Sequence, residues 1–521
     1  MGVRSLLYAA LSGILLTFSL PYFDVPVLAW FGFVPFFIAL DGPGPGSGFR
    51  AGFVLGCVYF AGALYWLPAS IHTYGGIPLS AAILAALLLC MVFSLYYAVF
   101  GAVAAHLRRV RPALFFIAAP VVWTALEFAR AHLFTGFPWL LIGCSQYRSL
   151  PLIQIADLTG IYGVSFLIVL VNASIADAIG GKKTLRPLAI AAACLAAVLI
   201  YGYGKLRVPE QSGGLTISLV QANVEQHRKW DPAYRDEVVS AYRRLTQDAL
   251  SSHPDLVIWP ETSTPFYFNG PDNDSRKLSG ELALFVQHQR VPLLFGSPTC
   301  SRLPSRRIIA WNSALLLAAD GRPLAEYRKM HLVPFGEYAP FKGMPFFSEK
   351  LVQGAGDFEP GTEYTVMKLP ARTAGQADTA FGAVICYEII FPDLVRRFVA
   401  NGASLIATIT NDGWFGKTAA PYQHFAAAVF RAVENRVPVA RAANTGISGF
   451  IDSRGRILAA TDIFKEAQVT ASVRPGTEKT FYTRYGDMFA YGCALVALVM
   501  ILARKKLKAA RQPRMNTDKH R

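Results

Sequence analysis

Charged residues are scarce in this 521-residue chain: they make up 16% of it, and lysine and arginine (50) outnumber aspartate and glutamate (34). With 53% hydrophobic residues and a mean hydropathy of +0.35, the composition excludes an ordinary soluble globule. The scarcity is uneven, because residues 1–204 and 484–503 are nearly free of charge while residues 205–483 carry charges at ordinary density. The sequence therefore predicts a membrane protein with one large polar domain.

Several other features are missing. No zinc-ligand spacing, phosphate-binding glycine loop or basic-aromatic array occurs, and the histidines show no metal-ligand spacing. We therefore expect no metal, no cofactor and no nucleic-acid partner. Of the seven cysteines, only Cys300 and Cys386 fall in the polar domain. The sequence does not exclude a bridge between them, but Cys300 precedes a basic, loop-like stretch, which disfavours it.

Long apolar runs are what the chain has instead. About 20 apolar residues are needed for a helix to cross a bilayer. Eight stretches are expected to do so, namely 5–22, 26–40, 50–70, 80–106, 112–133, 152–179, 187–204 and 485–503. The second contains Pro35, and the sixth contains Asp157 and Gly160, so either could be tilted or broken. A cleaved signal peptide at residues 1–22 is disfavoured, since no small-x-small site follows.

Basic residues indicate the orientation of these spans. With the N-terminus in the cytoplasm, the loops expected inside contain Arg4, Arg50, Arg108, Arg109, Arg111, Lys182, Lys183, Arg186 and the tail residues Arg504, Lys505, Lys506, Lys508 and Arg511. The opposite loops hold little beyond Arg130 and Arg148. We expect a membrane region of seven helices at 1–204, an extracytoplasmic domain at 205–483, a membrane helix at 484–506 and a basic cytoplasmic tail at 507–521.

Strand and helix patterns alternate within the polar domain, which predicts a layered α/β fold. The expected strands are 215–224, 255–261, 291–297, 311–319, 380–388, 404–412 and 437–452. The expected helices are 236–250, 276–290, 392–402 and 422–435.

Two reactive side chains stand at the ends of expected strands, and a third lies between them in the sequence. Glu261 ends the run DLVIWPE, Lys329 lies in EYRKMHLVPFGEYAP, and Cys386 ends an apolar strand in FGAVICYE. A free thiol has a pKa of about 8.5 and is mostly protonated near neutral pH. A carboxylate that takes its proton and an ammonium that stabilises the developing negative charge are the neighbours it needs.

Glu261, Lys329 and Cys386 follow one another at intervals of 68 and 57 residues. This order resembles the Glu-Lys-Cys triad of the nitrilase superfamily, whose fold is an αββα sandwich. The motifs GFPW (136–139), KWDP (229–232), LVPFGEY (332–338), ICYE (385–388) and NDGWFG (411–416), together with the apolar spans, make the whole chain similar to the apolipoprotein N-acyltransferase family. The expected fold is thus a polytopic helical membrane bundle with a nitrilase-like sandwich domain.

The resemblance implies a reaction and a role for each residue. Cys386 would be the nucleophile that takes an acyl chain from a phospholipid as a thioester, Glu261 the general base, and Lys329 with the backbone N–H of Tyr387 the oxyanion donors. The acceptor would be the N-terminal amine of an S-diacylglyceryl cysteine on an apolipoprotein, at a bacterial inner membrane. Further essential positions of the family match Trp230, Glu337, Tyr387, Glu388 and Trp414.

Other interpretations remain open. A membrane-tethered amidase would use the same triad, and a scaffold or transporter could carry an inert domain. Glu337 and Glu388 could orient the triad or transfer protons, and both tryptophans could be core residues or guides for acyl chains. Within a span, Glu127 and Arg130 lie three residues apart and would pair near the outer interface, to hold the bundle together or to contact headgroups.

Overall fold

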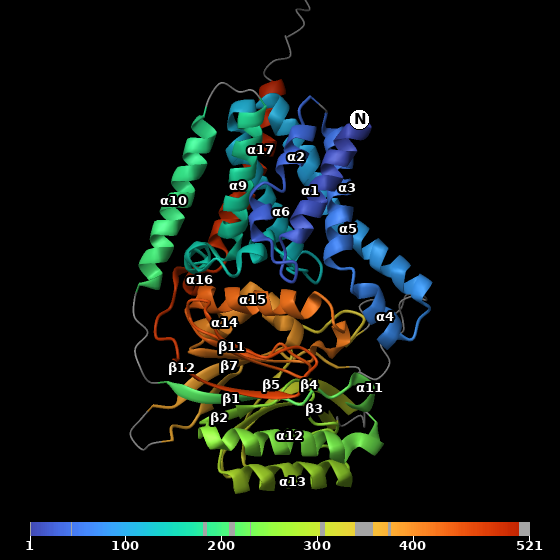
Figure 1. Cartoon of the computed structure of the whole chain (residues 1–521), viewed down its shortest axis with the longest axis vertical. Helices are drawn as coiled ribbons and strands as arrows, with labels where there is room; N and C mark the ends of the chain where they lie inside the picture. The colour runs from blue at the N-terminus through green and yellow to red at the C-terminus, as the bar shows by residue number, and fades with distance from the viewer. Residues whose placement is uncertain are drawn as a thin grey trace, which may run out of the picture.

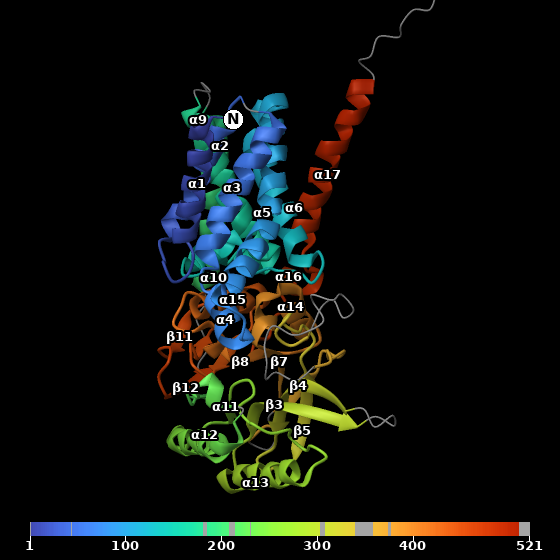
Figure 2. The ribbon, with the colours of Figure 1, turned by 90° about the vertical axis from the view of Figure 1, so that its right-hand side faces the viewer.

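The chain folds into a helical part stacked on a pair of β-sheets (Figure 1). The computed structural model describes residues 2–42, 44–180, 185–207, 214–229, 231–302, 308–338, 358–372 and 377–509. The N-terminus and the far end of α17 lie at the same end of the helical part, away from the sheets (Figures 1 and 2).

The helical part is built from the first 206 residues and the C-terminal helix. Its elements are α1 (Val3–Phe18), η1 (Pro26–Trp30), α2 (Val34–Ala39), α3 (Pro45–Ala63), α4 (Leu67–Gly75), α5 (Leu79–Val110), η2 (Pro112–Leu114), α6 (Phe115–His132), η3 (Ile142–Gln146), α7 (Leu150–Ile153), α8 (Ala156–Thr159), α9 (Ile161–Ile179), α10 (Arg186–Leu206) and α17 (Met488–Ala509).

Among the described residues, four helices are long and apolar enough to cross a membrane: α5, the η2–α6 segment, α9 and α10. A fifth candidate is the pair α3 and α4, which is bent by 56°. The remaining predicted stretches coincide with shorter apolar helices, so the count of eight spans stays a prediction. The sixth stretch is broken at Gly160, whose φ is +63° and where a Cβ would lie 2.7 Å from the Tyr482 ring.

Small residues let α3 and α5 approach closely. A Cβ on Gly48 would lie 2.3 Å from the Gly101 carbonyl oxygen, and one on Gly52 would lie 2.1 Å from that of Tyr97. Gly48, Gly52 and Gly56 recur every four residues and so share one helix face. This spacing is the small-xxx-small pattern of membrane helices, which associate by close packing because the hydrophobic effect does not drive helices together in lipid.

The predicted αββα sandwich is confirmed. The described residues form two six-stranded sheets. The first sheet has the order β12 (Ala467–Val473), β1 (Leu215–Gln221), β2 (Leu256–Ile258), β3 (Leu293–Arg302), β4 (Ile308–Leu317) and β5 (Pro323–Arg328). The second has the order β11 (Ile457–Ala460), β10 (Gly449–Ile451), β9 (Val439–Ala443), β8 (Leu405–Thr410), β7 (Thr379–Ile385) and β6 (Val366–Leu369).

Helices cover the outer faces of both sheets. The two long ones on the first sheet are α12 (Arg235–Ala249) and α13 (Asn273–Gln289), and α14 (Pro392–Ala400) and α15 (Ala420–Asn435) separate the second sheet from the helical part (Figure 1). The shorter elements are α11 (Gln226–Lys229), η4 (Pro232–Tyr234), η5 (Leu250–Ser252), η6 (Cys386–Ile390), η7 (Asp412–Phe415) and α16 (Phe481–Tyr485).

Alternation along β2 shows how the sheets divide the core. Val257 and Trp259 pack with α12 and α13, whereas Leu256 and Ile258 point to the second sheet. The core between the sheets continues without a break through α14 and α15 into the membrane helices. The strand ends that face this core are therefore enclosed between the two sheets.

Candidate active site

The three predicted reactive residues follow three strand ends. Glu261 comes shortly after β2 and Lys329 directly after β5, both in the first sheet, while Cys386 comes directly after β7 in the second. All three are buried, with exposed fractions of 5%, 1% and 6%. The face-to-face packing of the sheets thus brings together residues that are up to 125 positions apart in the sequence.

Lys329 lies between two carboxylates. Its Nζ is 3.4 Å from Oε1 of Glu261 and 2.9 Å from the carboxylate of Glu337. Burial by itself lowers the pKa of this lysine, but Glu337 and Glu261 together outweigh burial and raise it. Lys329 is therefore a buried, charged ammonium rather than a solvated surface lysine.

The carboxylate of Glu261 has a fixed orientation. Its Oε1 also accepts a hydrogen bond from Asn312 Nδ2 at 2.7 Å, and its Oε2 accepts one from the backbone N–H of Asn411 at 3.0 Å. Asn312 Nδ2 also lies 2.8 Å from Oε1 of Glu337. The asparagine amide therefore holds the two carboxylates on either side of the ammonium.

Cys386 occupies a left-handed backbone conformation, with φ at +51°. Residues other than glycine rarely adopt it, and it persists only where the surroundings hold it. Burial raises the pKa of the Cys386 thiol, the Glu261 carboxylate raises it further, and Lys329 partly opposes both. The resting sulfur is therefore a protonated thiol that needs a base when a substrate arrives.

Glu388 connects the strand of the lysine to the strand of the thiol. Its Oε1 accepts hydrogen bonds from the Tyr327 hydroxyl at 2.7 Å and from the N–H groups of Met330 at 2.8 Å and His331 at 3.1 Å. Its Oε2 accepts one from the Ile385 N–H at 2.7 Å. A fully buried carboxylate with four donors is occupied with positioning, which favours the orienting interpretation over proton transfer.

Glu337 is similarly engaged. Besides Lys329 and Asn312, it accepts a hydrogen bond from the Val333 N–H at 2.8 Å. Its contacts fix the turn that follows Lys329 and the charge on that lysine.

The aromatic candidates lie on the side of the helical part. Tyr387 stacks with Trp139 of the GFPW motif, with ring centroids 6.4 Å apart. Trp414 meets the ring of Tyr74 on α4 edge-on at 4.8 Å, and the Tyr74 hydroxyl donates to the Gly413 carbonyl at 2.9 Å. Trp230 lies outside the described residues.

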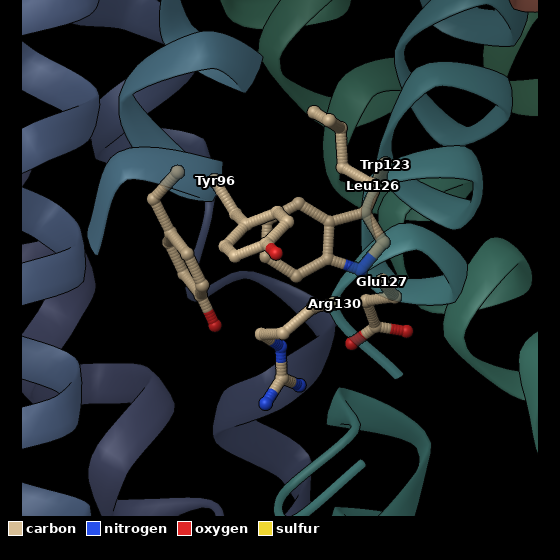
Figure 3. Close-up of a pocket in the computed structure, with 6 residues that line it drawn as sticks. Tyr96, Trp123, Leu126, Glu127 and Arg130 are labelled. Atoms are coloured by element: carbon tan, nitrogen blue, oxygen red, sulfur yellow. The ribbon is translucent and has the colours of Figure 1, made fainter. Parts of the chain in front are cut away.

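Glu127 and Arg130 on α6 bind backbone rather than each other. Arg130 donates to the carbonyls of Phe137 at 2.9 Å and Trp139 at 2.8 Å, and Glu127 accepts from the Ile142 N–H at 2.8 Å. Their predicted ion pair is not among those of the described residues. Both line a cavity of about 10 Å³ beside Tyr96, Tyr97, Trp123 and Leu126 (Figure 3), room for about one water molecule.

A second buried amine was not predicted as part of the site. Lys229, in the KWDP motif, is fully buried, and its Nζ donates to the Glu261 carbonyl at 2.8 Å. Burial lowers its pKa to about 7, although Glu261 and Cys386 oppose that shift. The sequence analysis also did not predict Asn312 and Asn411 as residues of the site. For Asn312 one signal was available, namely a single amide side chain inside an otherwise apolar strand. Cys300 and Cys386 are both free.

Two family models match the chain: the apolipoprotein N-acyltransferase N-terminal domain over residues 12–174, and carbon-nitrogen hydrolase over residues 216–481. The apolipoprotein N-acyltransferase of Geobacter metallireducens is 41% identical and covers 95% of this chain and 94% of its own length. That of Haemophilus influenzae is 30% identical, with coverage of 95% and 94%. Among solved structures, Saccharomyces cerevisiae Nit3, of the nitrilase superfamily, is 20% identical over 51% of this chain and 91% of its own, with a TM-score of 0.38.

Proposed function

This chain belongs to the apolipoprotein N-acyltransferase family, and from that membership we propose that Cys386 carries a fatty acyl chain from a phospholipid to an apolipoprotein. The protein is a membrane-bound acyltransferase of bacterial lipoprotein maturation. The observation that carries the assignment of the site is the burial of a thiol, a carboxylate and a paired ammonium at adjoining strand ends.

In the first half-reaction Cys386 attacks the ester carbonyl of the phospholipid. As the sulfur–carbon bond forms, the thiol proton passes to Glu261, because the raised pKa of the thiol leaves little thiolate at rest. The tetrahedral intermediate then collapses, the bond from carbon to glycerol oxygen breaks, and Glu261 returns the proton to that oxygen. The products are a thioester on Cys386 and a lysophospholipid.

In the second half-reaction the free amine of an S-diacylglyceryl cysteine attacks the thioester. Glu261 takes a proton from the nitrogen, the carbon–sulfur bond breaks, and the sulfur regains its proton. An amide on the apolipoprotein and the resting thiol result. This ping-pong order is supported by the buried Cys386 thiol, which lies beside the carboxylate–ammonium pair and can hold the acyl chain between the two half-reactions.

Both tetrahedral intermediates carry a negatively charged oxygen. We assign two donors to that oxyanion: the ammonium of Lys329 and the backbone N–H of Tyr387. Glu337, 2.9 Å from the Lys329 Nζ, keeps that lysine charged. Preorganised donors of this kind act most strongly where water is excluded, and Glu261, Lys329 and Cys386 are all buried.

We assign the sheets to the periplasmic side of a bacterial inner membrane and both termini to the cytoplasm. The placement of the N-terminus and the end of α17 at the end opposite the sheets supports this, as does the distribution of basic residues. The assignment keeps the division into 1–204, 205–483, 484–506 and 507–521. Both substrates carry acyl chains, so a site next to the membrane helices suits them.

The test is incubation of the purified protein in detergent with phospholipid and a synthetic diacylated lipopeptide, followed by mass measurement of the peptide. We expect a mass gain of one acyl chain, lost in Cys386→Ser and kept in Cys300→Ser, which removes a half-buried thiol elsewhere in the polar domain. Release of free fatty acid without peptide acylation would show that water rather than the amine takes the acyl chain, and would favour the hydrolytic alternative, a membrane-tethered amidase of the same superfamily. Retention of the protein's biological role in Cys386→Ser would identify an inert scaffold.

A further inference from the structure

A second polar cluster contacts the backbone of Cys386. It consists of Asp412 after β8, His424 on α15 and Arg441 on β9, and all three have an exposed fraction of 0%. His424 Nε2 lies 3.0 Å from the carbonyl oxygen of Cys386. Nothing in the proposed acyl transfer uses these three side chains, so their contact with the nucleophile's backbone calls for a reason.

The proton on His424 can be placed from its partners. A carbonyl oxygen only accepts hydrogen bonds, so Nε2 carries the hydrogen and donates it to Cys386. On the other edge, Nδ1 lies 3.0 Å from Nη2 of Arg441 and 3.0 Å from Oδ1 of Asp412. The same guanidinium nitrogen donates to Asp412 Oδ2 at 2.6 Å. Burial and the neighbouring Arg441 lower the pKa of His424, so the ring is neutral and Nδ1 accepts from Arg441. Asp412 holds that guanidinium in place, and the ring keeps its Nε2–H aimed at the carbonyl.

The carbonyl of Cys386 shares a planar peptide unit with the N–H of Tyr387. The two groups point in opposite directions, so the rotation that sets one also sets the other. A hydrogen bond accepted by the carbonyl also polarises the unit and strengthens its N–H as a donor. This peptide follows a residue with φ at +51°, a conformation that the neighbours must hold.

We propose that His424 is a positioning residue for acyl transfer: by donating to the Cys386 carbonyl, it aims and polarises the Tyr387 N–H that receives the oxyanion. The inference rests on the proposed function, since it needs Cys386 as nucleophile and Tyr387 as oxyanion donor.

The helical part also contacts this cluster. Trp139, of the segment held by Arg130, stacks on the His424 ring with centroids 5.4 Å apart and an interplanar angle of 27°. The orientation of the oxyanion peptide is therefore tied to the loop that follows α6.

Two substitutions that differ by one methylene separate positioning from general stability. His424→Gln places an amide N–H near the position of Nε2, whereas His424→Asn places it near Nδ1, toward Asp412, and does not reach the Cys386 carbonyl. Phe425→Leu is the background control, because it removes a buried ring from the next position of α15, where the ring faces Gly449. Cys386→Ala tests the proposed function itself.

Three rates are measured for each variant that keeps Cys386: acylation of Cys386 by phospholipid in a single turnover, transfer from the acyl-enzyme to the diacylated lipopeptide, and alkylation of Cys386 by iodoacetamide. Cys386→Ala is assayed only for acyl transfer to the lipopeptide. Alkylation is a displacement at a saturated carbon and forms no oxyanion, so it reports the thiol and the fold alone. We expect His424→Asn to slow both acyl-transfer steps ~10- to 100-fold, His424→Gln and Phe425→Leu to stay within ~3-fold, and alkylation to stay within ~3-fold throughout.

Equal acyl-transfer rates in His424→Asn and Phe425→Leu would overturn the inference. So would a parallel fall in alkylation and acyl transfer, because His424 would then support the thiol or the fold rather than the oxyanion peptide. Full transfer in Cys386→Ala would instead refute the proposed function.

Discussion

Replacing Glu261 with glutamine should change two reactions of Cys386 in opposite directions. Acyl transfer loses its general base and should fall by ~100-fold or more. Alkylation by iodoacetamide needs only thiolate, and the Glu261 carboxylate is one of the groups that raise the pKa of the thiol. Removing that charge lowers the pKa of Cys386, so alkylation near neutral pH should become faster.

The size of the gain follows from the electrostatics of the buried site. Two unit charges ~5 Å apart at an effective dielectric constant of ~20 interact by ~3 kcal/mol, or ~2 pKa units. Relaxation reduces this, so a shift of ~1–2 units is expected, which raises the thiolate fraction ~10- to 100-fold. The positive charge persists in the variant, because Lys329 keeps its pairing with Glu337 at 2.9 Å.

The assay is the pseudo-first-order rate of iodoacetamide addition at pH 7, followed by mass spectrometry of the peptide that contains Cys386, beside the lipopeptide assay. Glu326→Gln is the matched control, since it also neutralises a carboxylate of the first sheet. Glu326 is bound to Ser313 on the adjacent strand β4, to Thr299 on β3 and to Arg328 on its own strand. It should leave both rates within ~3-fold. If Glu261→Gln slowed alkylation together with acyl transfer, Glu261 would be generating thiolate at rest and the electrostatic argument would be refuted.

Three further outcomes are expected. In the unaltered protein, alkylation of Cys386 should rise about tenfold per pH unit from pH 7 to 10, because its raised pKa keeps the thiol protonated; a plateau below pH 9 would contradict this. Lys229 releases its proton near pH 7 when folded but near ~10.4 when unfolded, so unfolding takes up a proton between these values and the free energy of unfolding rises with pH by up to ~1.4 kcal/mol per unit. In Lys229→Met the apparent melting temperature should therefore change less with pH between pH 7 and 10 than in the unaltered protein. The same pH dependence in both proteins would refute the lowered pKa of Lys229. Gly52→Ala should destabilise the protein by ~1–3 kcal/mol, since its Cβ meets the Tyr97 carbonyl at 2.1 Å, whereas Gly204→Ala, with nothing within 4 Å, should not; equal melting temperatures would show that α3 and α5 can separate freely.

The sequence was most informative where strands are buried on both faces. β7, β8 and β9 are parallel neighbours, mostly buried and rich in small, β-branched and apolar residues, and all three were predicted. β5, β6, β11 and β12 were missed because they lie at or near sheet edges, where short, partly exposed strands lack a continuous apolar run. The predicted strand 437–452 is two strands, β9 and β10, that run antiparallel.

The candidate site shows the same limit. Glu261 and Cys386 could be predicted because each carries reactive chemistry at the end of an expected strand. Lys329 was predicted from its place in the motif between them, since β5, which precedes it, was missed. The buried contacts around them could not be predicted, because they depend on which strands are neighbours: Asn312 and Asn411 reach Glu261 from β4 and from the end of β8. Glu388 likewise meets Met330 only because the two sheets pack together. The contacts of Glu127 and Arg130 could not be predicted either, because both side chains bind backbone groups of the irregular segment after α6, and hydrophobic periodicity does not reveal the path of such a segment.

Trimming the chain to its sheets would not yield a water-soluble enzyme. Every residue of α15 except Tyr422 is buried, although a helix that covers a sheet in a soluble protein normally keeps a polar outer face. Gln423 accepts hydrogen bonds from the indoles of Trp66 and Trp139, so even the polar groups of this helix are satisfied by the membrane-side segments. A truncated protein would present this helix to solvent and aggregate. Biochemistry on this enzyme must therefore start from the intact chain in detergent or lipid.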